Sequence, residues 1–177
     1  GRHGDYFWQS TEVILNMLGD RANPVRERVI RAGGELFRTY VINVGRALPR
    51  YQDQSATKVW GDLLRFKGNV LQLLGRPQRS DGLSAGVCSQ VFKFCETVVL
   101  LFSDPLTSGE AGLRKKGSLE NVLHGHPFLY HDVMRVEAAH IVTLMVDAFQ
   151  YELSQSNYTV LANVLGTIAK HRLTHLD

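Results

Sequence analysis

The prolines of this chain all fall between apolar-periodic segments, and this placement constrains the fold more than any other sequence feature. They stand at positions 24, 49, 77, 105 and 127. Proline interrupts a helix because it lacks a backbone N–H and its ring clashes with the preceding turn. The segments between them carry apolar residues three and four apart, the spacing of amphipathic helices. The sequence therefore predicts an all-α fold with helices at about 6–18, 23–47, 55–74, 80–101, 130–150 and 158–171.

The connections between these segments predict how the helices pair. Short turns join the first helix to the second, the third to the fourth and the fifth to the sixth, and short turns favour antiparallel neighbours. The pairs recur with a period of roughly 50 residues, close to that of helical-repeat solenoids. We therefore expect a HEAT-like α-α superhelix, or solenoid, of about three antiparallel pairs. Residues 104–128, rich in glycine, form one long loop between the second and third pairs.

Composition places the chain among ordinary globular proteins. It has 177 residues, of which 44% are hydrophobic and 21% charged. We expect residues 1–177 to form a single domain, and the first residue, Gly1, suggests that it is excised from a longer protein. Cys88 and Cys95 lie within one helical segment, which argues against a disulfide-stapled scaffold. No apolar run approaches the roughly 20 residues that a membrane span needs, so we expect a soluble protein with no membrane partner.

Positive charge is concentrated in the first part of the chain. The formal net charge is +3, but residues 1–103 carry an excess of five positive charges and residues 104–177 an excess of two negative ones. Arginines recur along the second helix and its exit, and those at 28, 31 and 38 share one helical face. Second helices line the inner side of a solenoid. We therefore predict a partner-binding stripe, with an ordinary solvated face as the alternative; it comprises Arg28, Arg31, Arg38, Arg46 and Arg50.

The stripe suits two kinds of partner. Guanidinium groups bind carboxylates and phosphates through paired hydrogen bonds, so an acidic protein surface or a phosphorylated peptide would fit. Direct RNA binding is the alternative. It is the weaker one, because aromatic side chains on which bases could stack are not interleaved with the arginines.

Two other patterns suggest chemistry, and each has a plainer interpretation. His124, His126 and His131 could bind zinc, but no cysteine lies near them and their spacing matches no structural zinc site. Cys88 could act as a nucleophile with His140 or His171 as its base, but a buried mid-helix thiol is inert. We therefore expect no catalytic residue, metal, cofactor or small-molecule substrate, and no enzyme.

The second helix contains two adjacent glycines, a residue type that is also common in phosphate-binding loops. Gly33 and Gly34 lie inside a helix rather than after a strand, so a phosphate-binding loop is not indicated. Glycine is unfavourable in a helix interior. A close approach of a neighbouring helix is the better interpretation.

The first turn carries a family resemblance. In LGDRANPVRERV, Asp20 is followed by Pro24, Val25 and Arg26. This spacing resembles a HEAT repeat. The resemblance implies that Asp20 closes the turn and caps the second helix, that Val25 packs between the helices, and that Arg26 joins a ladder of ion pairs. Pro24 suits the first helical turn, where its missing N–H costs nothing.

Over most of its length the chain more closely resembles the N-terminal domain of the symplekin family. The resemblance rests on the order and spacing of several stretches rather than on one motif. These are DRANPVRERVIRAGGELFRTYV, VWGDLLRFKGNVLQLL, SDGLSAGVCSQVFKFCETVVLLFSD, SLENVLHGHPFLYHDV and LGTIAKHR.

This resemblance implies a function that composition and periodicity do not. It implies a nuclear, non-enzymatic scaffold of the machinery that cleaves and polyadenylates pre-mRNA. In that family the domain recruits a phosphatase of the RNA polymerase II C-terminal domain, and we expect recruitment through the concave face. The loop at 105–126 is expected to add a secondary contact or a mobile cover.

Overall fold

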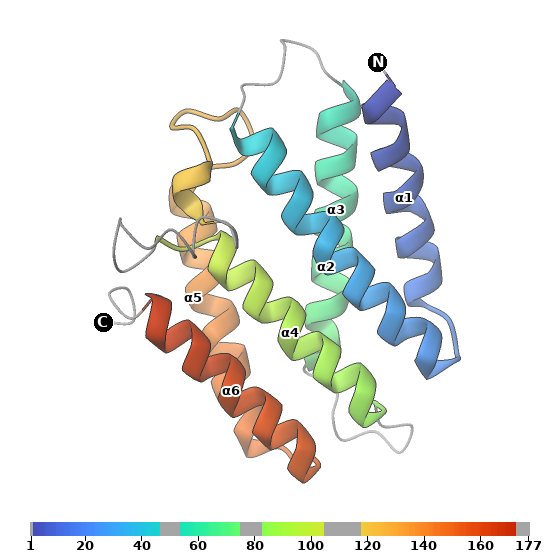
Figure 1. Ribbon diagram of the computed structural model, residues 1–177, viewed down its shortest axis with the longest axis vertical. Coiled ribbons are helices and arrows are strands. Elements are labelled where there is room, and N and C mark those ends of the chain that lie inside the picture. The colour runs from blue at the N-terminus through green and yellow to red at the C-terminus, as the bar shows by residue number, and fades with distance from the viewer. Residues whose placement is uncertain (1, 47–53, 75–82, 105–117, 173–177) are drawn as a thin grey trace.

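The computed structural model describes residues 2–46, 54–74, 83–104 and 118–172. Every regular element in these ranges is helical, which confirms the predicted all-α fold (Figure 1). None of the described helices is long and apolar enough to cross a membrane. The elements are α1 Arg2–Leu18, α2 Asn23–Gly45, α3 Gln54–Leu74, α4 Ala85–Leu101, η2 Leu119–Asn121, α5 His131–Asp147, η3 Ala148–Gln150 and α6 Gln155–Arg172.

The starts of α4 and α6 differ from the expected ones, and a serine hydroxyl caps each of them; α1 also begins earlier than expected, at Arg2. Residue 84 is not helical, so a start at 80 or 81 was too early. The Ser84 hydroxyl instead accepts a hydrogen bond from the Val87 N–H at 3.1 Å and caps α4. At α6 the helix begins earlier than expected, and the Ser154 hydroxyl accepts from the Asn157 N–H at 3.3 Å. Local side-chain capping therefore overrides the apolar period at helix ends.

The helices form two layers. The first helices of the pairs, α1, α3 and α5, run one way, and the second helices, α2, α4 and α6, return beside one another in front of them (Figure 1). We call the row formed by α2, α4 and α6 the second-helix layer, and the row formed by α1, α3 and α5 the first-helix layer. Packing is extensive along the second-helix layer and between α1 and α3. The predicted three antiparallel pairs are confirmed.

An aromatic cluster forms the centre of the core between the layers. Phe37 of α2 is fully buried. Its ring centroid lies 5.8 Å from that of Trp60 on α3, 5.9 Å from that of Phe94 on α4 and 5.8 Å from that of Phe102. Phe66 of α3 extends the cluster edge-on to Phe94, at 5.6 Å. These rings join both layers of the first two pairs.

The adjacent glycines lie where α2 meets this cluster. Gly33 and Gly34 are both buried. A Cβ atom added at Gly33 would lie 2.2 Å from Cζ of Phe66, whereas one at Gly34 would lie 3.4 Å from Cδ2 of Phe94. The Phe66 ring therefore occupies the space of a side chain at Gly33, which explains why the close approach requires glycine.

Buried polar pairs tie the first-helix layer together. Asp62 of α3 accepts hydrogen bonds from Thr11 of α1 at 3.3 Å and from Arg65 at 2.6 Å. Lys67 of α3 forms an ion pair with Glu137 of α5. Its ammonium group also lies 5.6 Å from the centroid of the Phe102 ring. The lysine side chain is only 6% exposed. Among the described residues this ion pair links α3 to α5, whose mutual packing is sparse.

The end of α6 reaches the end of α4. Arg172 is buried, and its guanidinium donates a hydrogen bond to the Leu100 carbonyl oxygen at 3.1 Å. That carbonyl belongs to the last turn of α4, where carbonyls lack helical partners. The arginine therefore caps a neighbouring helix.

The described part of the long loop folds back on α2. Of the predicted loop 104–128, residues 105–117 lie outside the described ranges. The following residues contain η2, and the Leu123 N–H donates to the Gly45 carbonyl oxygen at 2.8 Å. Gly125 has a φ of 75°, a conformation that glycine adopts readily. This segment thus closes over the C-terminal end of α2.

Candidate interaction surface

The predicted arginine stripe runs along the solvent-exposed side of α2. Arg28, Arg31 and Arg46 are exposed, and Arg38 is half-buried. At 100° per residue these four lie within about 80° of one another around the helix axis. Arg28 and Arg46 are nevertheless separated by about 27 Å along it. Arg50 lies outside the described residues.

Glu35 interrupts the stripe. Its carboxylate lies 3.9 Å from a guanidinium nitrogen of Arg38, one turn away, and it is 71% exposed. Arg38 therefore serves partly to balance an acid on its own helix. Arg28 and Arg31 take part in none of the ion pairs found among the described residues.

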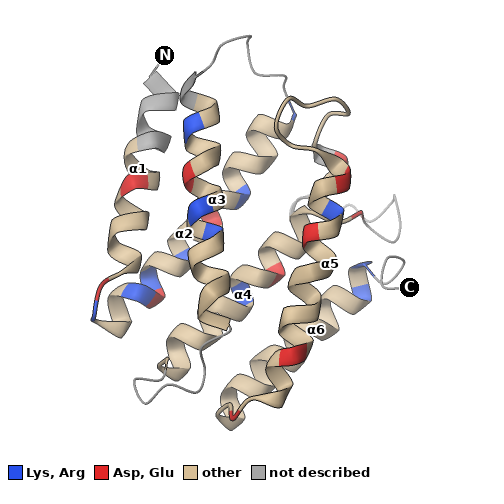
Figure 2. Cartoon of the chain, turned by 180° about the vertical axis from the view of Figure 1, so that it is seen from behind, with Lys and Arg blue, Asp and Glu red and all other residues tan. Residues whose placement is uncertain are grey.

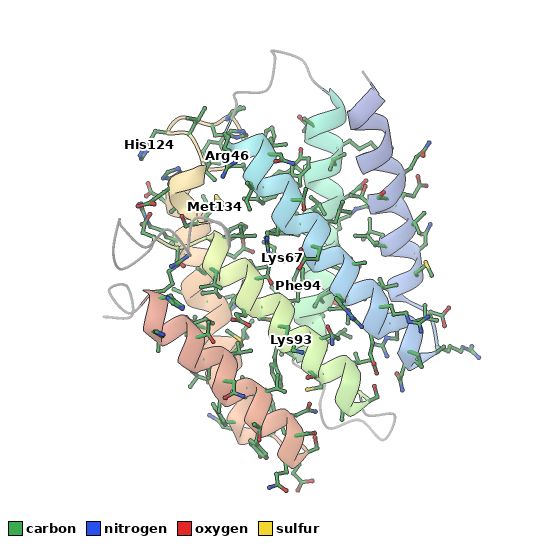
Figure 3. The ribbon with its side chains drawn as sticks, in the orientation of Figure 1. Arg46, Lys67, Lys93, Phe94, His124 and Met134 are labelled. Carbon is green, nitrogen blue, oxygen red and sulfur yellow. The ribbon has the colours of Figure 1, made fainter. Side chains whose placement is uncertain are left out.

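A groove of about 260 Å³ lies beside the stripe, between α2 and α4. Arg31, Gly34 and Glu35 line it from α2, and Lys93 and Thr97 line it from α4. Figure 3 shows Lys93 and Phe94 on the edge of α4 that faces α2. The groove thus brings a second cation, from a distant part of the sequence, next to one end of the arginine stripe.

Sequence reasoning missed the residues that α4 contributes. Gln90, Lys93 and Thr97 follow the three-and-four spacing of one helix face. That spacing was a usable signal, but α4 is so apolar that its core stripe dominates the pattern. The structure brings Arg31 to this face and leaves Arg46 at the far end of α2, so the predicted residues form no single cluster.

The first-helix layer presents a different charge pattern. Figure 2 shows this layer from behind, with bands of both signs along α3 and α5. Three of its basic side chains form ion pairs: Arg65 with Asp62, Lys67 with Glu137, and Arg135 with acids on two sides. The pairing leaves less positive charge available there than on α2.

The residues of the predicted HEAT motif lie around the turn between α1 and α2. The Asp20 carboxylate accepts a hydrogen bond from the Ala22 N–H at 2.7 Å, within the turn. Ala22 itself is the N-cap of α2 and no side chain caps it, so the expected capping by Asp20 was wrong. Pro24 occupies the first turn of α2, and Val25 packs against the core. Arg26 takes part in none of the ion pairs among the described residues. The ladder of ion pairs stays a prediction.

The histidines of the loop make structural contacts. His126 is buried, its Nε2 lies 3.2 Å from the Val44 carbonyl oxygen, and its Nδ1 accepts from the Leu129 N–H at 3.1 Å. The His131 Nε2 lies 2.9 Å from the Val122 carbonyl oxygen. Within the described ranges, no three metal-ligating side chains are grouped closely enough to hold an ion.

Burial also governs the cysteine that could act as a nucleophile. It raises the pKa of the Cys88 thiol to about 11. Such a thiol is almost entirely protonated at neutral pH and is a poor nucleophile. Cys95 is fully buried, and burial raises its pKa further.

Replacement of His126 should change how stability depends on pH. Burial lowers the pKa of His126 below 6.5, and the contact with Val44 only partly offsets this effect. The unfolded chain therefore binds more protons, so His126 should make the fold less stable as pH falls below about 6.5. In His126→Asn, the Asn oxygen can still accept from the Leu129 N–H but cannot titrate.

Urea denaturation at a series of pH values between neutral and mildly acidic would measure this effect. We expect the free energy of unfolding of His126→Asn to fall less steeply with acidification than that of the wild type. His140→Asn, at an exposed position on α5, is the control and should keep the wild-type slope. Equal slopes for the wild type and His126→Asn would contradict the assignment.

Comparison with known protein families finds a matching family model. The family model described as symplekin/PTA1 N-terminal matches residues 22–177, which include α2 through α6 and the whole arginine stripe. The turn residue Asp20 lies just before the matched range. No curated protein matches the chain.

Proposed function

The chain belongs to the symplekin/PTA1 N-terminal family, and from this membership we propose that its second-helix layer recruits a protein partner through the arginine stripe and the adjoining groove. The family supports a scaffold role in mRNA 3′-end processing, which implies work in the nucleus. The partner that we propose is the family's phosphatase of the RNA polymerase II C-terminal domain. The scaffold needs no catalytic group of its own for this role.

The observation that carries the proposal is the position of Arg28 and Arg31. Both are exposed on the second-helix layer, and neither takes part in an ion pair among the described residues. In repeat proteins the stacked helices create extended binding surfaces. Exposed cations on such a surface favour an acidic partner by long-range steering and by charge-assisted hydrogen bonds.

RNA binding has less support. The aromatic residues described on α2, Phe37 and Tyr40, are buried. They cannot stack on bases, and stacking supplies much of the affinity of single-strand binders. RNA binding is therefore the alternative result that the experiment must distinguish from protein binding.

The test is retention of the phosphatase by the immobilised chain from nuclear extract, followed by direct binding with purified phosphatase. We expect the double variant Arg28→Glu/Arg31→Glu to lose at least tenfold in affinity, because each reversal replaces an attraction by a repulsion. Arg38 is left unchanged because reversing it would place it against Glu35. Thermal unfolding should shift little, since both side chains are exposed.

Lys58→Glu/Lys170→Glu is the matched control, with the same change in net charge at positions on α3 and α6 that belong neither to the stripe nor to the lining of the groove. It should bind as the wild type does. Equal binding by both double variants would remove the stripe from the interface. Loss of retention after nuclease treatment would show that RNA carries the interaction and would overturn the protein-binding proposal.

A further inference from the structure

The walls of the groove between α2 and α4 are polar, although its base is apolar. Ile30 and Phe94 line its base and are almost fully buried, with exposed fractions of 0% and 2%. A partner therefore finds little apolar surface to cover. Recognition in this groove depends on the charged and amide groups of its walls.

Cations stand on both walls. Arg31 comes from α2 and Lys93 from α4, and Gln90 of α4 adds an amide donor. The Thr97 hydroxyl donates to the Lys93 carbonyl oxygen at 3.0 Å, so it can only accept further hydrogen bonds. The donors that remain are suited to an anion that enters between the two helices.

Glu35 limits the charge of that anion. It lines the same groove, and Arg31 lies one turn before it on α2, within reach of a side-chain contact. Arg31 and Lys93 together with Glu35 leave one excess positive charge on the walls. A single carboxylate matches this charge better than a phosphate group, which carries nearly two negative charges at neutral pH.

We propose that the groove seats the carboxylate of a glutamate or aspartate side chain from an acidic segment of the partner, between Arg31 and Lys93. The inference rests on the proposed function, because it assigns one contact within the second-helix layer. Glu35, whose carboxylate lies 3.9 Å from Arg38, stands on the wall of the groove and repels the incoming carboxylate. The groove therefore binds more weakly than its cations alone would allow.

The experiment measures fluorescence anisotropy of labelled peptides with the purified chain. One peptide carries adjacent glutamates in a serine and alanine context, the second has glutamines in their place, and the third has phosphoserines. The glutamate peptide should bind, and the glutamine peptide should lose at least tenfold in affinity. Tighter binding of the phosphoserine peptide than of the glutamate peptide would overturn the assignment of a carboxylate.

Two variants test the walls separately from the stripe. Lys93→Glu should lower the affinity for the glutamate peptide about tenfold or more, because a charge-assisted hydrogen bond becomes a repulsion. Glu35→Gln should raise the affinity for the same peptide several-fold, a gain that loss of structure cannot produce. Lys170→Glu is the control and should leave the affinity unchanged. An unchanged affinity in Lys93→Glu or in Glu35→Gln would overturn the inference.

The same variants distinguish this inference from the proposed function. Arg28→Glu/Arg31→Glu could abolish phosphatase binding while Lys93→Glu and Glu35→Gln leave it unchanged. This result would support the stripe as the interface and contradict a role for the groove. The groove variants could change peptide affinity as expected although the chain binds no phosphatase. This result would support the groove as a carboxylate site and contradict the phosphatase as the partner.

Discussion

Replacement of Phe37 by alanine is expected to lower the free energy of unfolding by about 3–5 kcal/mol. The side chain is fully buried, and its ring packs against three other aromatic rings from α3, α4 and the segment after α4. Truncation removes the apolar contacts of a whole ring and leaves a cavity. The surrounding rings are large and fixed by their own contacts, so they can fill only part of it.

Urea denaturation followed by circular dichroism measures this loss. Phe149→Ala is the matched control, because Phe149 is 41% exposed and, among the described residues, its ring stacks on that of Tyr158, with centroids 6.2 Å apart. We expect it to cost less than about 1 kcal/mol. A loss from Phe37→Ala no larger than that of the control would show that the cluster does not hold the layers together.

Gly33→Ala is expected to destabilise the fold by about 1–3 kcal/mol, although alanine is the better helix former. The added methyl group would lie 2.2 Å from Cζ of Phe66. Phe66 is fully buried and packs edge-on to Phe94, so it cannot swing into solvent. Either α2 must move away from α3, or the ring must leave its packed position.

Gly68→Ala makes the same chemical change in a helix interior without a clash. No atom lies within 4 Å of a Cβ built at Gly68. We expect it to raise the free energy of unfolding, by up to about 1 kcal/mol, because alanine restricts the unfolded chain. Opposite signs for the two variants in one denaturation assay support steric exclusion at Gly33. A stabilising Gly33→Ala would rule it out.

The helices and their pairing were predictable because they depend on local patterns. Pro24 marks the start of α2, and the three-and-four spacing of valines, leucines and isoleucines marks the faces that pack. The close approach at Gly33 was also predictable, because glycine in a helix interior needs a reason. Its cause, the Phe66 ring, was not, since the two residues meet only in the folded chain.

The candidate site was predictable only in part for the same reason. The arginine stripe belongs to one helix and can be read from its spacing. Lys93 joins Arg31 only through the packing of α4 on α2, and the sequence separation hides this relation. The ion pair of Lys67 with Glu137 is a further case, because a lysine in an amphipathic helix is ordinarily expected to be solvated.

The uneven packing of the two layers has a mechanical consequence. The second-helix layer is continuous from α2 to α6, and Arg172 fastens its last helix to the end of α4. In the first-helix layer, α3 and α5 meet sparsely and share the Lys67 to Glu137 pair. Spreading α5 from α3 therefore disrupts fewer contacts than separating α4 from α2 or α6. We therefore expect the fold to open more readily between α3 and α5 than within the second-helix layer.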